Sequence, residues 1–70
     1  MKKLVIETTK GTKTFQLSPN ARGYDVYRVT SGFLSDTRKY VGHGSSLENA
    51  VAIARMEVGE SVIRSTKLKD

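Results

Sequence analysis

The first 41 residues contain short runs that are rich in apolar or β-branched residues, and in residues 13–17 these alternate with polar ones as in a half-buried β-strand. Turns that contain glycine or serine separate four such runs: residues 3–8, 13–17, 24–30 and 37–41. Tyr, Val and Thr make the third run the strongest strand by composition. Pro19 cannot donate to a strand ladder, so residues 18–23 are expected to form a loop. The pattern predicts two antiparallel hairpins in succession.

The second half begins with a helical repeat. Its apolar residues recur at the spacing that places them on one helix face: Leu47, Ala50, Val51, Ala54 and Val58. Ser45 and Glu48 fit a capping box, in which the serine accepts a hydrogen bond from a free amide and the glutamate reaches back to the serine amide. Gly59 is placed to end the helix. A helix beginning near Leu47 is therefore predicted.

Two interpretations remain open after Gly59. Ser61 and Val62 continue the helical stripe, and Glu60 with Arg64 has the spacing of a favourable ion pair. The β-branched pair Val62–Ile63 instead favours a further strand over residues 61–68. Residues 66–70 are expected to form a loose tail.

These elements predict an α+β fold, ordered ββββα, with an antiparallel sheet of about four strands and one helix packed on one face. The C-terminal residues add a strand or a helical extension. Residues 1–70 are expected to form a single small domain.

The composition of the chain indicates which classes of partner are favoured but does not identify one partner. Twelve Lys and Arg against seven Asp and Glu give a net charge of +5, which favours nucleic acid, DNA rather than RNA, or an acidic protein surface as partner. The alternative is a basic surface that serves solubility alone. The chain has no cysteine and one histidine, so no metal site and no cofactor are expected. No apolar run is long enough to span a bilayer, so no membrane partner is expected. The absence of cysteine fits a reducing compartment, and a cytoplasmic location is predicted.

The glycine-rich loop Gly42–Ser46 is a candidate anion site because it precedes a helix N-terminus, where free backbone amides attract anions. It lacks the third glycine of a dinucleotide fingerprint and the lysine of a phosphate loop, so a single phosphate docking near Ser45 is the stronger hypothesis. His43 is interpreted as a solvated loop histidine. No pair of acids and no nucleophile has catalytic spacing, so no enzyme is predicted.

Arginines and tyrosines in the third and fourth runs are the main candidate site. If a helix covers Tyr27, Val29 and Val41, the open face displays Tyr24, Arg28, Arg38 and Tyr40. If it covers Val26 and Tyr40, the arginines lie at the edge of the core. The first arrangement combines cations with rings, the chemistry of phosphate contact and base stacking.

Residues 24–58 resemble the end of an AP2-type DNA-binding domain, and the arm-binding domains of tyrosine integrases look similar. The resemblance lies in a sheet hairpin, Tyr40-Val41-Gly42, a short polar loop, and the alanine-rich helix from Leu47 to Ala54. The resemblance implies that a sheet binds in the major groove of DNA, with Arg28, Arg38 and Lys39 facing that groove.

The first hypothesis is therefore a non-enzymatic nucleic-acid-binding module. Its site would comprise the sheet face and the helix N-terminus: Tyr24, Arg28, Arg38, Lys39, Tyr40 and Ser45. The second is a small protein-binding regulator or inhibitor, such as mobile elements carry, acting through a sheet edge or through Phe33 and Leu34 in the turn at 31–36. A homodimer formed through an open strand edge is consistent with either hypothesis.

Overall fold

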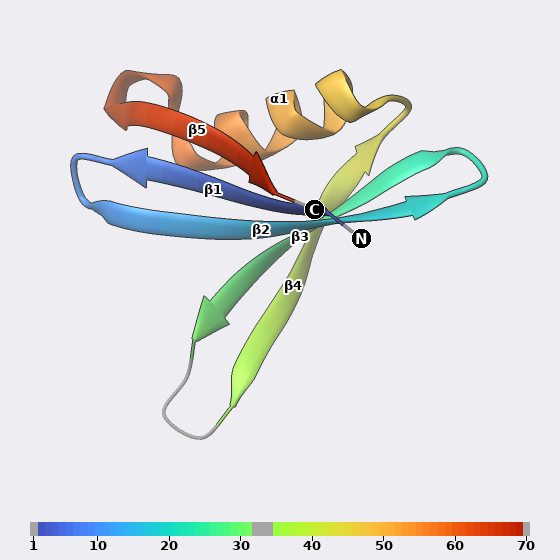
Figure 1. Cartoon of the computed structure of the whole chain (residues 1–70), viewed down its shortest axis with the longest axis horizontal. Helices are drawn as coiled ribbons and strands as arrows, with labels where there is room; N and C mark the ends of the chain where they lie inside the picture. Colours follow the sequence, from blue (N-terminus) through green and yellow to red (C-terminus); the bar gives the residue numbers. More distant parts are fainter. Residues whose placement is uncertain (1, 32–34, 70) are drawn as a thin grey trace.

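The computed structural model describes residues 2–31 and 35–69. Its elements follow in this order: β1 (Lys2–Thr8), β2 (Gly11–Asn20), β3 (Gly23–Ser31), β4 (Asp36–Gly44), α1 (Leu47–Val58), the short 3-10 helix η1 (Glu60–Val62) and β5 (Ile63–Lys69). The strands form one antiparallel sheet in the order β4-β3-β2-β1-β5, and α1 covers one face of it (Figure 1). The predicted α+β fold is confirmed, with the C-terminal segment as a fifth strand.

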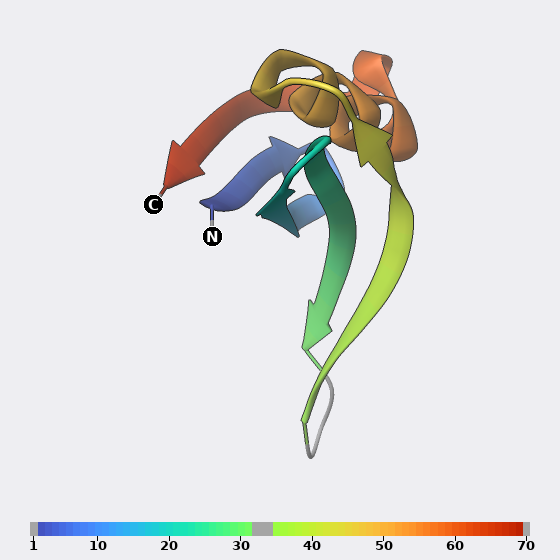
Figure 2. The ribbon, with the colours of Figure 1, turned by 90° about the vertical axis from the view of Figure 1, so that its right-hand side faces the viewer.

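The core lies between the helix and the sheet face that the helix covers. Alternate residues of the first three strands point into it, and two helix alanines allow close approach; all are completely buried: Leu4, Ile6, Phe15, Leu17, Val26, Ala50 and Ala54. Figure 2 shows that the sheet curves towards the helix and that the outer parts of β3 and β4 project away from it. The opposite face, called the outer face below, carries no covering element in the described residues.

Two predicted boundaries are wrong. Pro19 lies in the last part of β2 opposite Tyr24, not in a loop, because strand ends tolerate a residue without an amide hydrogen. The helix cap is Ser46, not Ser45: Ser46 has extended dihedral angles and its Oγ accepts from the Asn49 amide at 3.2 Å.

The helix ends at Gly59, as predicted. Gly59 has φ of 102°, a conformation that a residue with a side chain rarely adopts, and its amide donates to the Arg55 carbonyl. The chain then turns through η1 into β5, which pairs with β1 as far as Lys69 opposite Lys3. The loose tail predicted for residues 66–70 is therefore replaced by strand up to Lys69.

Arg55 connects the helix to this C-terminal segment. Its guanidinium donates to both carboxylate oxygens of Glu60 at 3.0 and 2.8 Å and to Thr66 Oγ1 at 2.7 Å. The hydrogen bond from Arg55 is the main cause of a lowered pKa at Glu60. Glu60 thus pairs with Arg55, and not with Arg64 as the helical spacing had suggested.

Candidate nucleic-acid interface

A β-bulge in β4 decides which residues share a face. Val26 pairs with Gly42 and Tyr27 pairs with Tyr40, so Val41 is an extra residue between them. Val41 packs against the core. Because of this extra residue, the alternation of side chains between the two faces is reversed at Val41. The part of β4 before Val41 therefore has its side chains on the faces opposite to those that unbroken alternation from Gly42 would give.

The predicted set Tyr24, Arg28, Arg38 and Tyr40 is therefore divided between the two faces. Tyr24 and Arg28 lie on the helix side with Val26, whereas Arg38 and Tyr40 lie on the outer face with Tyr27. Neither arrangement considered from the sequence is correct, because both assumed unbroken alternation along β4.

The outer-face residues form a compact unit, called the tyrosine platform here: Gln16, Tyr27, Arg38 and Tyr40. The two rings meet edge to face, with centroids 5.7 Å apart and planes at 71°. The Arg38 guanidinium carbon lies 5.3 Å from the centre of the Tyr27 ring, and Arg38 Nη1 donates to Gln16 Oε1 at 2.7 Å. Arg38 is thus held in place beside the rings.

The platform leaves one aromatic ring accessible. Tyr40 is 55% exposed, although large aromatic side chains in small folds usually bury most of their surface. Tyr27 is half-buried between its neighbours. An exposed ring next to a fixed cation can stack on a planar group while the cation contacts an anion attached to it.

Two further cations lie on the helix side of the projecting β3–β4 hairpin. Arg28 is directly opposite Lys39, and Lys39 is exposed. Within residues 2–31 and 35–69, neither side chain has a hydrogen-bond or ion-pair partner. Like charges that face each other across strands are destabilising, so an anion near this pair would relieve repulsion.

The other candidate residues occupy different places. Tyr24 is partly buried and packs against the core. Ser45 is exposed, and its Oγ accepts a hydrogen bond from Asn49 Nδ2 at 2.7 Å at the start of the helix. Phe33 and Leu34, the candidates for protein binding, lie outside the described residues.

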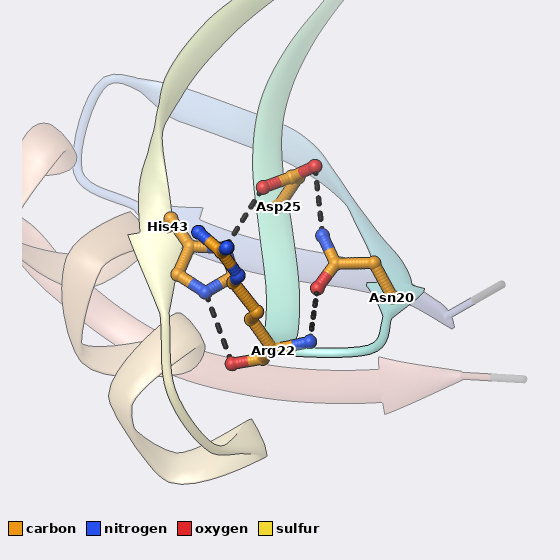
Figure 3. Close-up of polar contacts among 4 residues, drawn as sticks. All are labelled: Asn20, Arg22, Asp25 and His43. Atoms are coloured by element: carbon orange, nitrogen blue, oxygen red, sulfur yellow. Dashed lines mark hydrogen bonds and ion pairs between the residues drawn. The ribbon is translucent and has the colours of Figure 1, made fainter.

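A second polar cluster lies next to the platform, where the β2–β3 turn approaches β4 (Figure 3). His43 Nδ1 is 2.9 Å from Asp25 Oδ1, and His43 Nε2 is 3.1 Å from the Arg22 carbonyl oxygen. Asn20 Nδ2 donates to Asp25 Oδ2 at 3.0 Å, and the Arg22 amide donates to Asn20 Oδ1 at 2.9 Å. With Tyr40, these residues line a shallow hollow.

The His43 ring is surrounded by acceptors. Both of its nitrogens face oxygens that can only accept, and only the doubly protonated ring donates to both. The hydrogen bond to Asp25 is the main cause of a raised pKa at His43, and the Arg22 carbonyl adds to it. Because both nitrogens are engaged, neither is directed at Ser45 or Ser46 as a base would be. His43 is a strand residue, and not the loop residue that the sequence suggested.

The sequence pattern did not indicate that Tyr27 and Gln16 belong to the candidate site. Only the sheet register reveals them, since Gln16 pairs with Tyr27 and Tyr27 with Tyr40.

Among the described residues, no three acids or histidines are grouped as metal ligands would be. Within the same residues, no helix has the length and apolar character to cross a bilayer. Comparison of the chain with protein-family models, with curated proteins and with solved structures finds no match. The resemblance to AP2-type and arm-binding domains thus stays an analogy of layout.

Proposed function

We propose that this protein is a non-enzymatic nucleic-acid-binding module that contacts its ligand through the outer face of β2, β3 and β4. The observation that carries the proposal is the tyrosine platform, with Tyr40 exposed and Arg38 held beside it by Tyr27 and Gln16. Arg38 would contact a backbone phosphate, and Tyr40 would stack on a base or pack against a sugar.

Charge supports the same partner. The net charge of +5 attracts a polyanion, and the projecting β3–β4 hairpin concentrates Arg28, Arg38 and Lys39. Arg28 and Lys39 point to the helix side and Arg38 to the outer face, so a polyanion at the hairpin would meet cations on both sides.

The sheet edges favour this proposal over binding to another protein strand. β4, at one edge, is interrupted by the bulge and carries Arg38 and Lys39; β5, at the other, carries Arg64, Lys67 and Lys69. Bulges and exposed cations are features that discourage strand addition at an edge. A regulator or homodimer that used an edge would have to overcome them.

Fluorescence anisotropy with labelled DNA and RNA at several salt concentrations tests the proposal. Binding should weaken as salt rises, because each neutralised phosphate releases counterions. Tyr40→Ala should remove about 1–3 kcal/mol of binding free energy, the usual contribution of a stacked base.

Arg38→Gln should weaken binding and reduce the salt dependence. Arg64→Gln is the matched control, since Arg64 is also an exposed strand arginine and has no partner in residues 2–31 and 35–69. Circular dichroism confirms that each variant is folded. Absence of binding to every nucleic acid at low salt would refute the proposal. If Arg38→Gln and Arg64→Gln lost the same amount of affinity, binding would be a diffuse electrostatic attraction without a defined site.

A further inference from the structure

The outer face continues beyond the platform, across all five strands. Two neighbouring rows of directly paired residues cross it from β5 to β4. One row consists of Lys69, Lys3, Gln16, Tyr27 and Tyr40; the other consists of Lys67, Val5, Thr14, Val29 and Arg38. The bulge at Val41 brings Tyr40 and Arg38 into these rows, and the pairing of β5 with β1 brings in the two C-terminal lysines.

The charges in the rows are all positive and lie at their two ends. Lys3, Lys67 and Lys69 form a lysine cluster at one end, and Arg38 lies at the other, with neutral residues between them. No residue in either row is acidic. The acids of the outer face, Glu7, Asp25 and Asp36, all lie outside the rows. Glu7 accepts a hydrogen bond from Thr12, and Asp25 is engaged by His43 and Asn20.

The positive charges of the lysine cluster are not balanced by an acidic partner in the described residues. Lys3 lies directly opposite Lys69, and no member has a hydrogen-bond or ion-pair partner in the described part of the chain. Like charges opposed across strands repel each other. An anionic ligand that reached across from the platform would relieve this repulsion.

The distance suits a short stretch of nucleic acid. Four inter-strand spacings of about 4.8 Å separate Tyr40 on β4 from Lys69 on β5, which gives about 19 Å. A single strand stacked at about 3.4 Å per phosphate would cover this distance with about six nucleotides, and an extended strand with fewer.

We propose that the ligand is a single-stranded nucleic acid that runs across the strands, with a base on Tyr40 and its phosphates continuing over the neutral centre to the lysine cluster. This inference rests on the proposed function and names its substrate class. An exposed ring can stack only on a base that is not already paired and stacked within a duplex. A flexible strand can also follow the outer face of a sheet that curves towards the helix (Figure 2).

The same chemistry is offered by single-stranded DNA and RNA, so both are tested. The probes are labelled homopolymers of about 12 nucleotides, one of thymidine and one of uridine, which do not pair with themselves, together with a duplex of equal length. The single strands should bind more tightly than the duplex at the same salt concentration. A difference between the two homopolymers would show whether the sugar is recognised.

The lysine cluster is tested by the double variant Lys67→Gln with Lys69→Gln. Its salt slope on a single strand should fall by about 1.4, from two phosphate contacts at about 0.7 each. The charge-matched control is Lys10→Gln with Arg64→Gln, two exposed cations that lie outside both rows. This control should leave the slope nearly unchanged. Thermal melting verifies that both double variants are folded.

Each result has a distinct consequence. If the duplex bound as tightly as the single strands, the proposal of a single-stranded ligand would be overturned, but the proposed function would stand. The same conclusion would follow if the two double variants had equal salt slopes. Loss of binding in Tyr40→Ala without any effect of the lysines would confine the site to the platform and also overturn the path. No binding to any probe at low salt would overturn both proposals together.

Discussion

Gly44 and Gly42 lie two residues apart in β4 and face the helix, yet they should respond to alanine in opposite ways. A Cβ on Gly44 would lie 2.4 Å from the Ala50 nitrogen and 2.8 Å from the Ala50 Cα. Both are backbone atoms near the start of α1, which cannot rotate away. Gly44 is not among the glycines with positive φ, so its requirement is for space and not for conformation.

The magnitudes follow from these contacts. Gly44→Ala must push the start of the helix off the sheet, and overpacking of this kind costs about 1–3 kcal/mol. The whole chain, at about 0.05–0.15 kcal/mol per residue, has roughly 3.5–10 kcal/mol of stability to lose. A Cβ on Gly42 would meet only the side chain of Ile53, with Cγ2 at 3.4 Å and Cδ1 at 3.9 Å. Gly42→Ala should be neutral, or stabilise by up to about 1 kcal/mol through lower entropy of the unfolded chain.

Urea unfolding followed by far-ultraviolet circular dichroism measures both variants. The midpoint should fall for Gly44→Ala and stay constant or rise for Gly42→Ala, with similar slopes. Equal midpoints in the two variants would refute the close contact between β4 and the helix.

Three other outcomes are expected. His43 is the sole histidine, so nuclear magnetic resonance should give its pKa directly: above 6.5, and lower in Asp25→Asn. Because the folded pKa is raised, its stabilisation is complete below pH 6.5 and is lost as the pH rises through the folded value; a pH-independent difference between wild type and His43→Gln in urea unfolding would contradict this. Ser46→Ala should cost about 1 kcal/mol in urea unfolding and Ser45→Ala much less, and the reverse order would restore Ser45 as the cap. Phe15→Ala should cost about 3–5 kcal/mol, so an unchanged thermal melting profile would be incompatible with its complete burial.

The strands, the helix and the helix end at Gly59 could be predicted because they depend on local pattern. The sequence predicts the helix cap one residue too early because Ser45 and Ser46 are both suitable cap residues. Only the backbone separates them: Ser46 has φ of −144° and ψ of 169°, which directs its hydroxyl at the Asn49 amide.

The arrangement of the candidate site could not be predicted, because it depends on one extra residue. Gly42 and Gly44 face the helix, and unbroken alternation would place Tyr40 on the same side. The bulge at Val41 reverses this and moves Tyr40 to the outer face. Val41 is a β-branched residue like many others in strands, so nothing in the amino-acid sequence around it indicates a bulge.

The lysine cluster was also beyond local reasoning. Val62 and Ile63 suggested a strand, but a pattern does not show which strand will be its neighbour. Lys67 and Lys69 join Lys3 only because β5 pairs with β1, from the opposite end of the chain.

That pairing of the first strand with the last also shapes how the protein folds. The hairpins β1–β2, β2–β3 and β3–β4 can form between neighbours in sequence, whereas β1–β5 closure must bring together segments separated by nearly the whole chain. Such non-local contacts are slow because their loop entropy is lost before they give any stability. Until β5 arrives, β1 exposes an unpaired edge that contains Leu4, Val5 and Ile6. The sheet should therefore be most prone to aggregation late in folding, just before its last strand docks.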